Sequence, residues 1–142
     1  MSFFKKKYIN PLVIAHREMK LLNANYSFLE CKIQNSVLYC YGSIQPTEES
    51  ITYDYRIRYI PSIRPTVTVT NPIIVYNDDI HMYPADNSLC LYHSSDLVWN
   101  STCHLYNTII PWTHEWFVFY ELYKITGRWL HPFVPHKKEK KK

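Results

Sequence analysis

The chain contains very little glycine, with 2 Gly against 9 Pro in 142 residues. Loops that wrap a nucleotide phosphate need several glycines in a short stretch, so this kind of nucleotide site is excluded. The sequence also lacks the H-E-x-x-H pattern of zinc proteases and the G-x-S-x-G pattern of serine hydrolases. None of these three common catalytic schemes is therefore available to the protein.

Long apolar segments are also missing. No apolar run reaches the roughly 18 residues that a helix needs to cross a bilayer. The segment Met1–Lys7 has neither the apolar stretch nor the cleavage site of a secretory signal. We therefore expect a cytoplasmic protein, in which the 4 Cys stay reduced.

The formal net charge of +4 is concentrated near the ends of the chain, at Lys5–Lys7 and over 137–142. The final run is either a solvated, disordered tail or a basic segment that binds an acidic partner or nucleic acid through its charge. The middle of the chain has no stripe of Lys and Arg, which makes nucleic-acid binding unfavoured. The hydrophobic fraction of 46% is enough for a buried core. We predict one folded domain over 8–134 and a basic disordered tail over 135–142.

A helix is predicted near the N-terminus. Asn10 is a good N-cap, and Pro11 suits the first helical position. Glu18 is expected to lie away from the buried face, and the helix is expected to end near Asn23. The apolar residues of the predicted buried face recur at helical spacing: Leu12, Ala15, Met19 and Leu22.

Four stretches then alternate apolar and polar residues, as strands do: 29–33, 37–44, 53–59 and 67–69. Asn35 and Ser36 predict a tight turn between the first two, and Cys31 is expected to point inward. Because the strands are short and their connections have turn length, the pattern predicts an antiparallel meander.

The segment 71–100 has little regular pattern and is much longer than a usual connection, so we expect a functional loop there. A final helix is predicted over 112–126, with Thr113 as N-cap and Gly127 just after its end. The fold class is therefore α+β: an N-terminal helix, a four-stranded antiparallel meander, a long active-site loop and a C-terminal helix. A set of aromatic residues is expected to pack the last helix, or to form an interface: Trp112, Trp116, Phe117, Phe119, Tyr120 and Trp129.

Cys90 stands in the irregular segment, between the predicted strands and the final helix. A thiol in a polar loop suits acyl transfer, because a thiolate attacks carbonyl carbons and forms a labile thioester. Since Leu89 and Leu91 alternate with Cys90, the sulfur is expected to be exposed if both leucines face inward. The alternative is a buried structural thiol. His81 is expected to order the loop through its imidazole rather than to act as a base.

Two other arrangements compete with Cys90. Cys103 and His104 form a rival nucleophile pair, although Cys103 falls where the chain turns helical and is expected to be buried. A zinc site is a further alternative, but its four ligands contain no C-x-x-C pair: Cys90, His93, Cys103 and His104. Asp96 could deprotonate an attacking amine, or could simply be solvated.

Four short motifs follow one another along the chain: Tyr-Ile-Pro-Ser-Ile-Arg-Pro at 59–65, His-Met-Tyr-Pro at 81–84, Ser-Leu-Cys-Leu at 88–91, and Trp99. In the same order they resemble the Tyr-Pro…Pro-Pro segment, the His-Pro-Asn motif, the Gly-Ile-Cys-Leu active-site stretch and the following tryptophan of ubiquitin-conjugating (E2) enzymes. The resemblance extends over about residues 10 to 132 and implies the fold of that family.

The downstream segments 110–116 and 120–129 look more like bacterial E2-like proteins of cyclic-oligonucleotide antiphage (CBASS) operons. This resemblance implies that Cys90 accepts an activated C-terminal carboxyl as a thioester and passes it to an amine. The implied partners are the C-terminus of a cGAS-like nucleotidyltransferase and, where one is required, an activating E1-like protein. No metal or organic cofactor is implied. The alternative is a catalytically inactive E2-like binding module.

One position departs from the family pattern. His81 is not followed by the asparagine that helps to stabilise the oxyanion when an amine attacks. Asn87, His93, Ser94 or Ser95 could supply the missing hydrogen-bond donor. The sequence leaves this choice open.

Overall fold

The structure is a computed structural model, and it describes residues 10–131. Lys5–Lys7, the predicted tail 135–142 and the outer ends of the predicted 8–134 domain lie outside these residues. The described elements are, in order, α2 Pro11–Asn25, β1 Glu30–Gln34, β2 Val37–Ile44, β3 Tyr53–Tyr59, β4 Thr66–Asn71, β5 Met82–Tyr83, β6 Ser88–Leu89 and α3 Ile109–Thr126.

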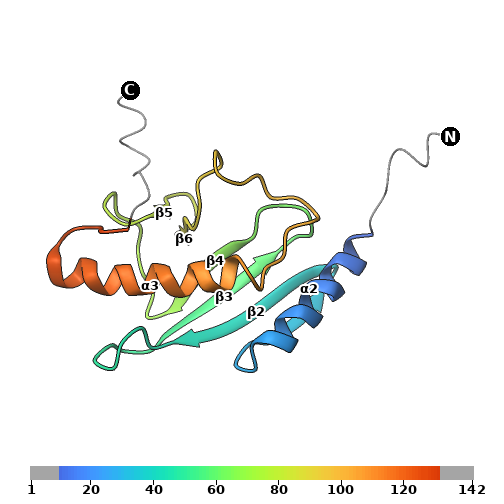
Figure 1. Ribbon diagram of the computed structural model, residues 1–142, viewed down its shortest axis with the longest axis horizontal. Helices are drawn as coiled ribbons and strands as arrows, with labels where there is room; N and C mark the ends of the chain where they lie inside the picture. The colour runs from blue at the N-terminus through green and yellow to red at the C-terminus, as the bar shows by residue number, and fades with distance from the viewer. Residues whose placement is uncertain (1–9, 132–142) are drawn as a thin grey trace.

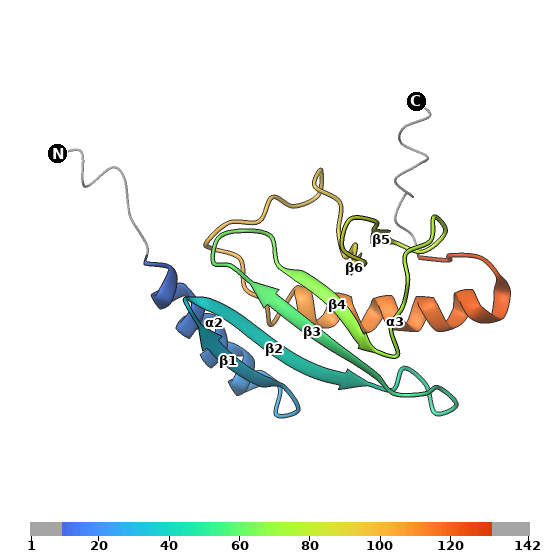
Figure 2. The ribbon, with the colours of Figure 1, turned by 180° about the vertical axis from the view of Figure 1, so that it is seen from behind.

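Two helices cover one face of a single antiparallel sheet. Figures 1 and 2, which view the molecule from opposite sides, show α2 lying over β1 and β2 and α3 lying over the inner strands. Alternate residues of β3 point into the layer between them, and Tyr53 packs its ring 4.9 Å from that of Phe117 in α3. The α+β prediction is confirmed. Within residues 10–131, no helix is long and apolar enough to cross a membrane.

The sheet has six strands in the order β1-β2-β3-β4-β6-β5, where four were predicted. The four predicted strands are present, and β1 and β2 turn at Asn35 and Ser36, whose φ angles of 54° and 64° suit a two-residue hairpin. The additional strands β5 and β6 come from the segment expected to be irregular. Each is only two residues long, too short for a period-two pattern to stand out in the sequence.

Both helices differ in detail from their predictions. The Asn10 side chain caps α2 by accepting from Leu12 N at 2.8 Å, as predicted. However, Leu12 is 43% exposed, while Glu18 is fully buried. The buried face is therefore rotated from the predicted one, because an ion-paired carboxylate takes a place that apolar periodicity assigns to hydrocarbon. Helix α3 already begins at Ile109, so Thr113 is buried inside the helix and is not its N-cap.

The end of α3 agrees with the sequence. Gly127 has a left-handed φ of 77°, and its N–H donates to Tyr123 O at 2.7 Å. A residue without Cβ adopts this conformation without steric cost, so the glycine ends the helix. The chain then turns back, and Trp129 packs with its ring 5.4 Å from that of Trp116.

Candidate functional site

The β5–β6 hairpin positions Cys90. Its register pairs Met82 with Leu89 and Tyr83 with Ser88, and β6 joins the main sheet through β4. Cys90 follows β6 directly, and its N–H donates to the carbonyl oxygen of His81 at 3.0 Å. The backbone of Cys90 is thus held by the sheet rather than by a mobile loop.

The expectation of an exposed sulfur at Cys90 is wrong. Cys90 is 3% exposed, and its neighbours Leu89, Leu91 and Tyr92 are buried as well. Alternation between inside and outside requires one face in water, but this segment lies between α3 on one side and the Tyr83 side chain on the other. The thiol of Cys90 donates to the carbonyl oxygen of Tyr92, with a sulfur–oxygen distance of 3.7 Å.

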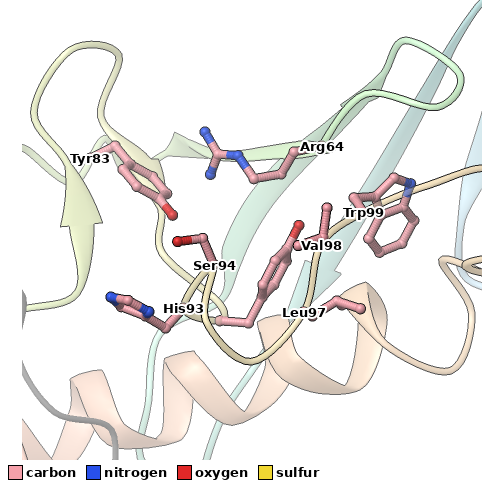
Figure 3. A pocket seen from close by; sticks show the side chains of 8 residues that line it. Arg64, Tyr83, His93, Ser94, Leu97, Val98 and Trp99 are labelled. Carbon is pink, nitrogen blue, oxygen red and sulfur yellow. The ribbon is translucent and has the colours of Figure 1, made fainter.

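A groove of about 510 Å³ opens beside the cysteine. It is lined by Arg64, Tyr83, Tyr92, His93, Ser94, Leu97, Val98 and Trp99. Figure 3 shows Arg64 and Tyr83 turned toward each other, with Ser94 facing them from the opposite wall. The guanidinium carbon of Arg64 lies 4.2 Å from the centre of the Tyr83 ring, a cation–π contact.

Tyr83 connects this groove to the thiol. Burial, followed by a hydrogen bond with Cys90, raises the pKa of the Tyr83 hydroxyl well above its usual value, so the phenol is neutral at physiological pH. Burial also raises the pKa of Tyr92 to about 12, although the nearby Arg64 charge acts in the opposite direction. The wall of the groove therefore carries two neutral phenols and one cation.

A second, much smaller cavity of about 10 Å³ lies on the other side of Cys90, near the lower limit for one water molecule. Trp112, Trp116 and Trp129 line it together with His81 and His131. These aromatic side chains cover Cys90 from the side of α3. The aromatic set of the C-terminal region thus contributes to the core around the cysteine.

His81 lies beside Cys90 in this small cavity and is 6% exposed. Its carbonyl oxygen accepts from Cys90 N and, at 2.8 Å, from Trp116 Nε1. The hydrogen bonds that tie the cysteine segment to α3 therefore pass through the backbone of His81. The ring of His81 packs 5.4 Å from that of Trp129.

Asn87 and His93 take different positions. Asn87 forms the turn of the hairpin with a φ of 59°, and its side-chain oxygen accepts from Tyr76 N at 2.9 Å. It does not line the groove. His93 does line it, and its Nδ1 accepts from Ser95 N at 3.0 Å and lies 2.7 Å from Ser95 Oγ. Of the proposed oxyanion donors, His93 and Ser94 thus face the groove.

The rival nucleophile pair, Cys103 and His104, does not line the groove. His104 Nδ1 lies 2.8 Å from Glu18 Oε2, so this imidazole belongs to the contact between α2 and the segment that precedes α3. Cys103 is half-buried, with its sulfur 4.0 Å from Asn100 Oδ1. Within residues 10–131, no three His, Cys, Asp or Glu side chains converge on a point where they could hold a metal ion.

The structure adds three residues that sequence reasoning did not single out: Arg64, Tyr83 and Tyr92. Arg64 belongs to the 59–65 motif, which the fold places next to Trp99, because Trp99 Nε1 donates to Tyr59 Oη at 3.0 Å. Tyr83 lies within the 81–84 motif. Short motifs that are separate in sequence therefore meet at the groove. Membership of these motifs is the sequence feature that could have identified Arg64 and Tyr83 as site residues.

The fold and the site define an α+β protein with a sheet-anchored cysteine beside a polar groove. No curated protein matches the chain. The model of the family described as Type II CBASS E2 protein matches residues 18–137 of the chain, which is most of the chain's length. The protein therefore belongs to the Type II CBASS E2 family. This confirms the resemblance to CBASS E2-like proteins, and it supports an E2-like role with a protein partner in the CBASS system.

Proposed function

We propose that the protein is a thioester-forming conjugating enzyme that acts on the C-terminus of a cGAS-like nucleotidyltransferase. Cys90 carries the acyl group, and the 8–134 region is the working domain. The observation that carries the proposal is the groove of about 510 Å³, which Tyr83 connects to the Cys90 thiol. Membership of the CBASS E2 family adds support for the class of reaction.

The reaction has two steps. The Cys90 thiolate attacks the acyl carbon of a C-terminal carboxyl that is already activated, either as an adenylate or as a thioester of an E1-like protein. An S–C bond forms, and the activating group leaves with the electron pair of the bond that breaks. A neutral amine then attacks the thioester, a C–N bond forms, the C–S bond breaks, and Cys90 leaves as thiolate while the amine proton passes to solvent.

The other predicted residues have supporting roles in this proposal. His81 holds the Cys90 backbone through its carbonyl oxygen, and Asn87 shapes the hairpin that carries it. His93 lines the groove, and with Nδ1 accepting from Ser95 N, the other ring nitrogen of the neutral imidazole carries the proton. His93 is therefore the proposed substitute for the asparagine missing after His81.

The burial of Cys90 sets a requirement for this chemistry. At 3% exposure the sulfur is not reachable by an acyl carbon, so a covering side chain must move when the partner binds. Tyr83 separates Cys90 from the groove, while Trp129 covers it from the other side. Because Tyr83 lies at the groove where the substrate would enter, movement of Tyr83 is the shorter route to exposure.

The test is incubation of the protein with the nucleotidyltransferase, its activating protein and ATP, followed by electrophoresis with and without reductant. The wild type is expected to form an adduct that reductant removes. Cys90→Ser should form a more stable oxyester, and Cys90→Ala should form none. Cys103→Ser is the matched control, since this half-buried thiol lies outside the groove and should leave the adduct unchanged. An adduct that survives in Cys90→Ala would refute the assignment.

The burial of Cys90 also favours a second candidate, an E2-like binding module without catalysis. In that case the partner binds the protein, but the cysteine stays covered. Alkylation with iodoacetamide, mapped by mass spectrometry, separates the two candidates. If the partner speeds the alkylation of Cys90 while the buried Cys40 stays protected, the enzyme is supported. If Cys90 stays as protected as Cys40 in the complex and no adduct forms, the binding module is the correct description.

A further inference from the structure

Arg64 has hydrogen-bonding capacity that the protein does not use. Within residues 10–131, its guanidinium makes no hydrogen bond or ion pair, and its cation–π contact with Tyr83 occupies only one face of the group. Its planar edge can donate several N–H hydrogen bonds at once. Arg64 is also the only Lys, Arg, Asp or Glu among the residues that line the groove. The groove therefore favours a ligand that carries oxygen acceptors.

Tyr92 provides an independent observation. The side chain is 7% exposed and lines the same groove, yet its hydroxyl has no hydrogen-bond partner in the described part of the chain. A buried hydroxyl without a partner costs free energy, and an acceptor or donor on a ligand in the groove would remove that cost. The charge of Arg64 acts on this hydroxyl, so the two groups share one region of the groove.

The remaining walls suit an extended peptide. Leu97, Val98 and Trp99 supply an apolar wall, and Val98 is 74% exposed at its rim. An extended polypeptide offers a carbonyl oxygen on every residue and side chains on alternate sides, so one side can meet the apolar wall while oxygens meet the donors. Such a ligand satisfies both sets of groups at once.

We infer that Arg64 and Tyr92 form a binding subsite for a carbonyl or carboxylate oxygen in the C-terminal tail of the transferred protein. They are positioning residues, because they hold the tail while its acyl carbon reaches Cys90 past Tyr83. This inference rests on the proposed function for the identity of the tail. The substrate class is an extended C-terminal peptide that carries an oxygen acceptor opposite Arg64.

The first experiment measures binding and needs no chemistry at Cys90. The probe is a fluorescein-labelled decapeptide that copies the C-terminus of the cGAS-like nucleotidyltransferase named in the proposed function, and the readout is fluorescence polarisation. Arg64→Gln is expected to weaken binding by about tenfold or more, as for loss of a charge-assisted hydrogen bond. Arg58→Gln, which removes the same charge from the exposed side of β3, should bind like the wild type. Equal binding by both variants would overturn the inference, as would a wild type that does not bind the peptide.

Tyr92→Phe separates a binding role from a structural one. The change removes only a hydroxyl that has no partner in the free protein, so the urea midpoint should stay unchanged or rise. Affinity for the decapeptide should nevertheless fall, by about threefold to tenfold for one neutral hydrogen bond. A Tyr92→Phe protein that loses stability but keeps its affinity would show that the hydroxyl is structural.

The second experiment uses the acyl-transfer assay. If Cys90 forms the thioester, Arg64→Gln should raise the KM for the tail and leave kcat nearly unchanged, because the subsite acts on binding. A thioester with an unaltered KM overturns the inference and leaves the proposed function intact. Failure of all thioester formation refutes the proposed function, and the decapeptide assay still decides the subsite. A decapeptide with an amidated C-terminus distinguishes the acceptors, since weaker binding identifies the terminal carboxylate and equal binding identifies a chain carbonyl.

Discussion

Glu18 is the buried charge on which the packing of α2 depends. Its carboxylate is fully buried and accepts from Leu105 N at 2.8 Å, from Arg17 Nε at 2.7 Å and, through Oε2, contacts His104 Nδ1 at 2.8 Å. Arg17 also donates to Ser101 O at 2.7 Å. These contacts join α2 to the segment between the cysteine and α3, although the two are far apart in the sequence.

The loss of folding stability in Glu18→Ala follows from the groups that lose the carboxylate as their partner. The N–H of Leu105 stays buried without an acceptor, which costs about 1–3 kcal/mol. Breaking a buried ion pair from one side costs about 3–5 kcal/mol when the other charge stays buried. The side chains of Arg17 and His104 are 33% and 34% exposed, so the Arg17 charge and the His104 ring can turn toward water. We therefore expect a loss of about 3 kcal/mol, at the lower end of the range for a buried pair.

Equilibrium unfolding in urea measures this loss. With a slope of about 2 kcal/mol per molar, 3 kcal/mol lowers the midpoint by about 1.5 M. Glu18→Gln keeps an acceptor for Leu105 N but replaces the carboxylate beside Arg17 and His104 with a neutral amide. Its urea midpoint should therefore lie between those of the wild type and Glu18→Ala. Glu115→Ala is the control, because this side chain is 49% exposed and its contact with His131 is 3.4 Å long. If Glu18→Ala unfolds at the same midpoint as Glu115→Ala, the reasoning about the buried carboxylate is refuted.

The remaining predictions concern packing and pH. Gly42→Ala should lower the free energy of unfolding by about 1–3 kcal/mol, because the added Cβ would lie 2.7 Å from the Tyr55 ring; an unchanged urea midpoint would contradict this. Burial lowers the pKa of His114, so the unfolded chain binds this proton first, and stability should fall as the pH drops below about 6.5. His114→Gln should flatten this fall in urea titrations between about pH 7.5 and pH 5.5, above the range where carboxyl groups titrate; an unaltered pH dependence would show that another group is responsible.

Much of the framework could be predicted from local patterns. Asn10 and Pro11 begin α2, Asn35 and Ser36 turn the first hairpin, and Gly127 ends α3, each because the backbone conformation required there suits that residue type. The four longer strands were also predictable, since an antiparallel sheet with one covered face produces alternation. These features depend on interactions between residues that are close in sequence.

The features that local sequence patterns failed to predict all depend on long-range contacts. The strands β5 and β6 exist because β6 pairs with β4, at Thr68 and Ser88, and a two-residue strand has no pattern of its own. Glu18 is buried because Leu105, far along the chain, supplies its partner. Cys90 is buried because other side chains cover it from both sides. The alternation of apolar and polar residues within one strand gives no information about such covering.

By itself, the sequence determined the fold class, the turn and cap positions, and the resemblance that directed attention to Cys90, because each of these depends on residue types at short spacing. Only the tertiary structure decided that the thiol is covered, that Asn87 shapes a turn away from the groove, and that Arg64, Tyr83 and Tyr92 meet beside the cysteine. Burial and convergence depend on which distant segments pack together. Packing of this kind is a property of the whole folded chain and is not contained in any one motif.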